Sequence, residues 1–218
     1  MVNSANAREV QIPVGRRIVE GLLVIPRAAQ GAVIFAHGSG SGRHSPRNQY
    51  VARVLQEAGL ATLLLDLLEE EEAEDREKVF DIALLAERLQ DAADWLRSDP
   101  APQSLSLGYF GASTGAGAAL VAAARDPQIR AVVSRGGRPD LAGAFLAKVT
   151  APTLLIVGGN DDVVLRLNEE AAQQLAGPKE LVVIPGATHL FPEPGALEEV
   201  ARLARDWFLD YLPKSSAK

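Results

Sequence analysis

The sequence predicts an α/β fold with a mostly parallel central sheet, an antiparallel N-terminal edge and helices on both faces. Apolar runs of strand length alternate with stretches in which apolar residues recur at helical spacing. This strand-then-helix order recurs along the chain, which builds a parallel sheet covered on both sides. Only the first two segments, 10–14 and 17–25, alternate apolar and polar residues, as an antiparallel pair at a sheet edge does.

The remaining elements follow in order, each bounded by glycine, proline or polar residues. Further strands are expected at 31–36, 61–67, 131–134, 153–157 and 180–184, with one more running from 105 toward Gly111. Helices are expected at 46–58, 78–97, from the end of that strand to about 125, and at 140–147, 164–175 and 196–212. The acidic run 69–77 is interpreted as a solvated loop that leads into the helix at 78.

Composition narrows the class of protein. The 218 residues are 47% hydrophobic and 23% charged, which is typical of a globular protein with one core, so a single domain over 1–218 is expected, with 1–8 and 213–218 as frayed tails. The net charge of −6 argues against nucleic acid as a partner. No stretch resembles a signal peptide or a membrane span, so we expect a cytoplasmic protein without membrane contact, as a monomer or homodimer.

The absence of cysteine excludes disulfides, thiolate metal sites and a cysteine nucleophile together. The most informative segment is Gly111-Ala112-Ser113-Thr114-Gly115, which stands between an apolar strand-like run and an alanine-rich helix-like run. A serine on so sharp a turn needs neighbours that are nearly free of side chains, and the two glycines meet that need. Ser113 is therefore the candidate nucleophile.

A serine hydroxyl needs a base to take its proton and a third group to orient that base. His189 follows the last expected strand, at the carboxyl edge of the sheet where Ser113 also lies. Asp161 and Asp162 follow the strand 153–157 after two glycines, and we choose Asp161 as the orienting acid with Asp162 in reserve. The other aspartate is expected to cap the next helix.

The chain order Ser113, Asp161, His189 resembles that of the α/β-hydrolase superfamily, and within it the small lidless dienelactone hydrolase-like group. Four segments carry the resemblance, and they are His37-Gly38, Gly111–Gly115, Gly158-x-x-Asp161-x-x-Val164 and His189. The resemblance implies an oxyanion hole made by the backbone N–H groups of Ser39 and Thr114, and a bracing role for His37. It also implies hydrolysis of short-chain or small soluble esters, because no cap domain fits between 134 and 140. Dienelactone hydrolases in the strict sense carry cysteine at the sharp turn that holds the nucleophile, which is called the elbow below. Their substrate is therefore not implied for a chain with Ser113.

Other readings stay open. A thioesterase or amidase would use the same three residues, and a non-catalytic small-molecule-binding protein would retain them idle. No cofactor is expected, since the glycine run 38–42 lacks the third glycine of a dinucleotide fingerprint and no P-loop is present. His37, His44 and His189 show no metal-ligand spacing.

Arginines near the expected pocket are a last group of candidates. Arg135 and Arg138 follow the strand 131–134, and Arg43 and Arg47 lie on the loop after 31–36. They would place positive charge where it selects an anionic substrate, with Arg43, Arg135 and Arg138 as the candidate binding residues. Their alternative role is that of ordinary solvated surface arginines.

Overall fold

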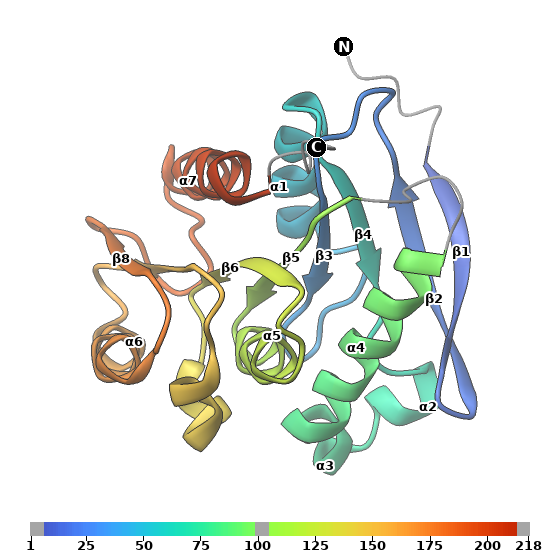
Figure 1. Cartoon of the computed structure of the whole chain (residues 1–218). Coiled ribbons are helices and arrows are strands. Elements are labelled where there is room, and N and C mark those ends of the chain that lie inside the picture. Colours follow the sequence, from blue (N-terminus) through green and yellow to red (C-terminus); the bar gives the residue numbers. More distant parts are fainter. Residues whose placement is uncertain (1–6, 99–104, 213–218) are drawn as a thin grey trace.

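The structure, a computed structural model, describes residues 7–98 and 105–212. An eight-stranded sheet runs through its centre in the order β1-β2-β4-β3-β5-β6-β7-β8 (Figure 1). The strands are β1 (Arg8–Val14), β2 (Arg17–Val24), β3 (Ala32–Ala36), β4 (Ala61–Leu65), β5 (Leu107–Ala112), β6 (Ile129–Arg135), β7 (Thr153–Gly158) and β8 (Lys179–Ile184). β1 pairs antiparallel with β2 and β2 with β4, whereas every pair from β4 to β8 is parallel. The predicted fold class is confirmed.

Helices cover both faces of this sheet. The helical elements are α1 (Pro46–Glu57), α2 (Glu70–Ala73), α3 (Arg76–Val79), α4 (Ile82–Ser98), α5 (Thr114–Arg125), the 3-10 segment η2 (Pro139–Lys148), α6 (Asp162–Gln174) and α7 (Ala196–Tyr211). α1 and α7 lie together on one face, and α4, α5 and α6 lie on the other (Figure 1). Each face has its own apolar core, and the middle strands contribute side chains to both. None of the helices described is long and apolar enough to cross a membrane.

Local sequence signals explain most of the boundaries. All five residues of β3 are buried, as its uninterrupted apolar run requires. α1 begins where Pro46 sets the first helical φ, and the Ser45 side chain accepts a hydrogen bond from the Asn48 N–H at 3.4 Å. It ends before Gly59, which has a φ of +83° that suits a helix C-terminus.

Three expectations are wrong in detail. The acidic run forms the short helices α2 and α3, and one of its residues, Glu72, is buried. α4 begins at Ile82 and not at Lys78, because the Asp81 carboxylate accepts the Leu84 N–H at 3.0 Å and so starts a new helix. The sequence predicts a frayed tail that includes Arg8, yet Arg8 begins β1 opposite Leu23. The expected tails at 1–6 and 213–218 lie outside the described residues.

Candidate active site

Ser113 lies on the sharp turn between β5 and α5. Its backbone has φ 51° and ψ −123°, a conformation that is costly for any residue with a side chain. Both flanking glycines are required by space, because a Cβ on Gly111 would lie 2.4 Å from the Ala116 Cα and one on Gly115 would lie 2.3 Å from the Ala36 carbonyl oxygen. The turn therefore lifts the serine hydroxyl clear of the sheet at the carboxyl edge.

His189 and Asp161 are brought together by the loops after β8 and β7. Asp161 Oδ2 lies 2.6 Å from His189 Nδ1. Since an ionised carboxylate can only accept, Nδ1 carries the proton and Nε2 keeps a free lone pair. Asp161 occupies the N-cap position of α6, but its side chain makes no capping bond and is committed to the imidazole. The exposed Asp162 is the first residue of α6, so the expectation that it caps the helix is wrong.

The end of β6 and the loop after it contact the Ser113 backbone and pass close to His189. Ser113 N–H donates to the Arg135 carbonyl at 3.3 Å, and the Arg138 N–H donates to the Ser113 carbonyl at 3.0 Å. On the other side, a Cβ at Gly136 would lie 3.6 Å from His189 Nδ1. No direct hydrogen bond joins the serine and histidine side chains in this part of the described chain, and such contacts often shorten only when substrate is bound.

The residues expected to form the oxyanion hole lie against each other. The loop after β3 passes so close to Ser113 that a Cβ on Gly38 would be 3.0 Å from the serine Cβ. The Ser39 N–H donates to the Thr114 side-chain oxygen at 3.0 Å, a contact that the sequence did not predict. Thr114 is also the first residue of α5, so its own N–H has no acceptor within the helix. The Thr114 N–H is thus without a helical acceptor beside the candidate nucleophile, whereas the Ser39 N–H, predicted to be the other direct donor, is already bonded to the Thr114 hydroxyl.

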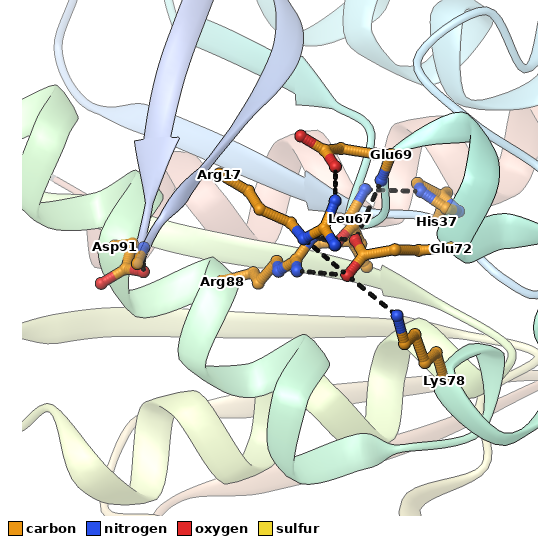
Figure 2. A network of polar contacts seen from close by, with 9 residues as sticks. Arg17, His37, Leu67, Glu69, Glu72, Lys78, Arg88 and Asp91 are labelled. Carbon is orange, nitrogen blue, oxygen red and sulfur yellow. Dashed lines mark hydrogen bonds and ion pairs between the residues drawn. The ribbon is translucent and has the colours of Figure 1, made fainter.

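His37 holds this loop to the segment after β4 (Figure 2). Its Nδ1 donates to the Gly38 carbonyl at 2.9 Å, and its Nε2 accepts the Leu67 N–H at 3.0 Å. This pair of partners requires the neutral ring, and burial lowers the pKa of His37 accordingly. His37 occupies the bracing position that the family resemblance implies.

A buried ion pair fixes the same segment from the other side (Figure 2). Arg88 on α4 donates to the Leu67 carbonyl at 3.1 Å and forms two hydrogen bonds with Glu72, at 2.7 and 3.0 Å. Burial alone would raise the pKa of Glu72, but the bonds from Arg88 and from the Glu69 N–H, with the charges of Arg88 and Arg17, hold that pKa at about 2. An arginine within the apolar stripe of a predicted helix was the available signal for such a partner.

Replacing Glu72 with glutamine is expected to lower the free energy of unfolding at neutral pH by about 3 kcal/mol, because Arg88 would keep a buried charge without a counter-charge. The pKa of Glu72 is depressed from its ordinary 4.5, so its contribution is complete above about pH 5 and is lost as the pH falls toward 2. The difference between wild type and variant should therefore narrow in acid. Urea unfolding near pH 7 and near pH 3 measures it.

The exposed neighbour Glu71 provides the matched control for this prediction. Glu71→Gln should change the free energy of unfolding by no more than about 0.5 kcal/mol at either pH. Equal losses in the two glutamine variants, or a Glu72→Gln loss that does not shrink in acid, would contradict the assigned role of the ion pair.

A pocket of about 600 Å³ opens beside the loop after β3, residues 37–41, which is called the oxyanion loop below. One end of the pocket is formed by His37, the following loop residues and Thr114. Apolar walls come from the β4–α4 region, with Leu67, Leu68, Val79 and Leu85. The carboxylate and guanidinium side chains that line it are mostly acidic, and they are Glu20, Asp66, Glu69, Glu70 and Arg43.

The three candidate substrate-binding arginines differ in their partners. Arg43 forms ion pairs with Asp66 and Glu20, and its N–H also donates to Asp66 at 2.7 Å. Arg138 makes two bonds to the Asp140 carboxylate, at 2.8 and 2.7 Å. Arg135 is only 7% exposed and forms no ion pair with any residue that the structure describes. Among residues 7–98 and 105–212, no group of three His, Asp or Glu side chains is arranged to hold a metal ion.

Comparison with known proteins identifies the family. The model of the dienelactone hydrolase family matches residues 19–212, which is nearly the whole chain. The chain belongs to the dienelactone hydrolase family. This match covers every segment of the candidate site, from the loop after β3 to the loop of His189.

A solved structure that is similar in sequence carries the same family name. A crystal structure of a dienelactone hydrolase from Anabaena variabilis is 60% identical, with a TM-score of 0.91 over 95% of this chain and 99% of that one. Est1E from Butyrivibrio proteoclasticus has a TM-score of 0.78 over 93% of this chain and 98% of that one at 18% identity, which shows the fold alone. A Mycobacterium tuberculosis protein named a phosphoribosyl transferase is 63% identical over 206 residues, 94% of this chain and 46% of that protein. The chain thus spans about half the length of the curated relatives that it matches.

Proposed function

We propose that the chain is a serine hydrolase that cleaves short-chain or small soluble carboxylic esters through an acyl-enzyme intermediate. The 2.6 Å contact between His189 and Asp161, beside a serine held at positive φ, carries the proposal. Membership of the dienelactone hydrolase family supports hydrolysis. Phosphoribosyl transfer is not proposed, because this chain spans less than half of the relative with that name.

In the first step, Ser113 Oγ attacks the ester carbonyl carbon while His189 Nε2 takes the serine proton. The carbonyl π electrons move to oxygen, and Asp161 stabilises the imidazolium through the proton on Nδ1. When the tetrahedral intermediate collapses, the bond to the alcohol oxygen breaks and the imidazolium returns its proton to that oxygen. Water then repeats the sequence on the acyl-serine and releases the acid. Asp161 stays ionised throughout.

The oxyanion formed in both steps is assigned to donors from Ser39 and Thr114. The Thr114 hydroxyl accepts the Ser39 N–H, so its own proton is free to point at the developing negative charge. The Thr114 N–H at the start of α5 is the second donor, with the helix dipole behind it. In this arrangement the Ser39 N–H acts through the threonine hydroxyl.

Thr114→Val is expected to lower kcat for p-nitrophenyl acetate by about 10²-fold with little change in KM, because one oxyanion donor is lost. Thr114→Ser keeps the hydroxyl and should retain most of the activity. Steady-state kinetics of the two variants decide the matter. A Thr114→Val enzyme as fast as wild type would mean that Ser39 N–H binds the oxyanion directly once the hydroxyl is gone.

The absence of a cap over Ser113 in the described chain supports small esters as substrates, and the neighbouring pocket adjoins the site through Thr114 and the loop after β3. This pocket measures about 600 Å³ and begins at the oxyanion loop. The connection between β6 and η2 consists of residues 136–138 only, so no cap covers the serine at that position. Without a cap to enclose a long acyl chain, the site is expected to prefer acetate and butyrate esters over octanoate.

The test is hydrolysis of p-nitrophenyl acetate, butyrate and octanoate, together with mass spectrometry after treatment with a fluorophosphonate. We expect faster turnover of the two shorter esters and a covalent adduct on the tryptic peptide 98–125, which contains Ser113. Faster turnover of thioesters or anilides would reassign the bond that is cleaved within the same mechanism. No turnover and no adduct would favour a non-catalytic small-molecule-binding protein on a hydrolase fold.

A further inference from the structure

Arg135, the last residue of β6, carries a buried guanidinium without a counter-charge. Its side chain is 7% exposed, and neither Nε nor Nη1 has a hydrogen-bond partner. Nη2 donates to Asn48 Oδ1 at 3.4 Å, a long contact with a neutral amide. A buried charge is costly unless it is paired, so this position is one that an anion would stabilise.

A second arginine and a helix end add to the same positive potential. Arg47, which precedes Asn48 on α1, also has a buried Nε without a partner among the described residues. Burial, with the charge of Arg47, lowers the pKa of Arg135 to about 10. The first turn of α1 contains no acidic residue, so its dipole is not compensated there. The Arg135 guanidinium thus contacts Asn48 in the first turn of this 12-residue helix and lies within reach of the charge of Arg47.

Two nearby arginines, in contrast, have carboxylate partners. Arg43 and Arg138 also lie on loops at the carboxyl edge, and each is neutralised by carboxylates of this chain. Arg47 and Arg135 have no such carboxylate in the parts of the chain that the structure describes. Of these four arginines, only Arg47 and Arg135 thus lack a counter-charge among the described residues.

The position adjoins the candidate nucleophile. Arg135 pairs with Ala112 across β5 and β6, and its carbonyl accepts the Ser113 N–H at 3.3 Å. Neighbouring strands lie about 4.8 Å apart, so the arginine backbone is one strand away from the elbow. An ester held at Ser113 has a substituent within side-chain reach of this strand end.

We propose that Arg135 and Arg47, with the first turn of α1, bind an anionic group of the substrate of Ser113, either a carboxylate or a phosphate. This position is called the anion site below. The proposal rests on the proposed function in assigning the anion to the substrate. Binding of an anion at the anion site does not itself depend on catalysis. A free inorganic anion has the same chemistry, and the experiment separates the two sources.

The first arm measures binding without activity. Thermal unfolding is followed in sodium phosphate and in sodium chloride at equal ionic strength. Phosphate at about a hundred times its dissociation constant should raise the Tm by about 5 °C over chloride in the wild type. Arg135→Met and Arg47→Gln should abolish the increase, whereas Arg130→Gln, an exposed arginine at the other end of β6, should keep it. Arg135→Met removes an unpaired buried charge and is expected to fold.

The second arm compares 4-acetoxybenzoate with the neutral 4-acetoxybenzamide, which has nearly the same shape. Arg135→Met should lower kcat/KM for the carboxylate about 10- to 100-fold, as loss of a charge-assisted hydrogen bond predicts, and leave the amide within about twofold. Arg130→Gln should change neither value. Such discrimination would support an anion carried by the substrate.

The outcomes are distinct. A phosphate-dependent Tm without discrimination between the two esters would support the anion site. It would assign the site to a free ion and overturn the assignment to the substrate. Equal Tm values in phosphate and chloride, with equal effects of Arg135→Met on both esters, would overturn the site. If the wild type hydrolysed neither ester, the proposed function would be overturned. The first arm would still show whether Arg135 and Arg47 bind an anion.

Discussion

Replacing Ser113 with alanine is expected to lower kcat for p-nitrophenyl acetate by about 10⁵- to 10⁶-fold, because no other group can form the acyl-enzyme at the elbow. The backbone at this turn does not depend on the hydroxyl, since the space is set by Gly111 and Gly115. Circular dichroism of the variant should therefore match the wild type, and the loss of activity should be chemical and not structural.

Ser113→Gly adds a second measurement to this prediction. Serine at φ 51° stores backbone strain, which glycine relieves, so the glycine variant should be more stable than the alanine variant by about 1 kcal/mol. Urea unfolding of the two inactive proteins tests this. Activity retained in Ser113→Ala would instead place the nucleophile elsewhere, with Ser39 and Ser41 on the oxyanion loop as the next candidates.

The order and type of the main elements could be predicted from the sequence because they depend on local periodicity. β3 reads as five consecutive apolar residues, and α1 begins at a proline and ends before a glycine. The elbow could be located for the same reason, since its two glycines answer a steric need within a few residues of Ser113. Such signals lie within one turn or one strand of the feature they predict.

The burial of Glu72 could not be predicted in this way. It stands among acidic residues, which suggest a solvated segment, and its partner Arg88 lies 16 residues further along on another helix. Only the packing of α4 against the segment after β4 brings the two charges together (Figure 2). The local pattern of α2 contains no trace of that packing.

The pairing states of the arginines were hidden for the same reason. Arg43, Arg135 and Arg138 are equivalent candidates by position in the sequence. The structure distinguishes them by their carboxylate partners: Arg138 pairs with one 2 residues away, Arg43 with two that are each 23 residues away, and Arg135 with none among the described residues. The contact between Ser39 and Thr114 spans 75 residues and was equally out of reach.

Asp161→Asn should lower kcat by about 10⁴-fold, whereas Asp162→Asn should leave it nearly unchanged. Asparagine at 161 would present its amide to His189 Nδ1 and favour the tautomer in which Nε2 carries the proton, so the ring could not accept the serine proton. It would also remove the charge that stabilises the imidazolium. Asp162 only adds a negative charge to the first turn of α6, where it contributes to helix stability.

Steady-state hydrolysis of p-nitrophenyl acetate by the two asparagine variants makes this comparison with one atom changed in each. KM should vary little in either, because neither carboxylate faces the pocket beside the oxyanion loop. Similar losses in both variants would argue for a general effect of charge near the site, and a larger loss for Asp162→Asn would exchange the two roles. The 2.6 Å contact favours Asp161, since an acid can hold the imidazole in one orientation only if it is bonded to it.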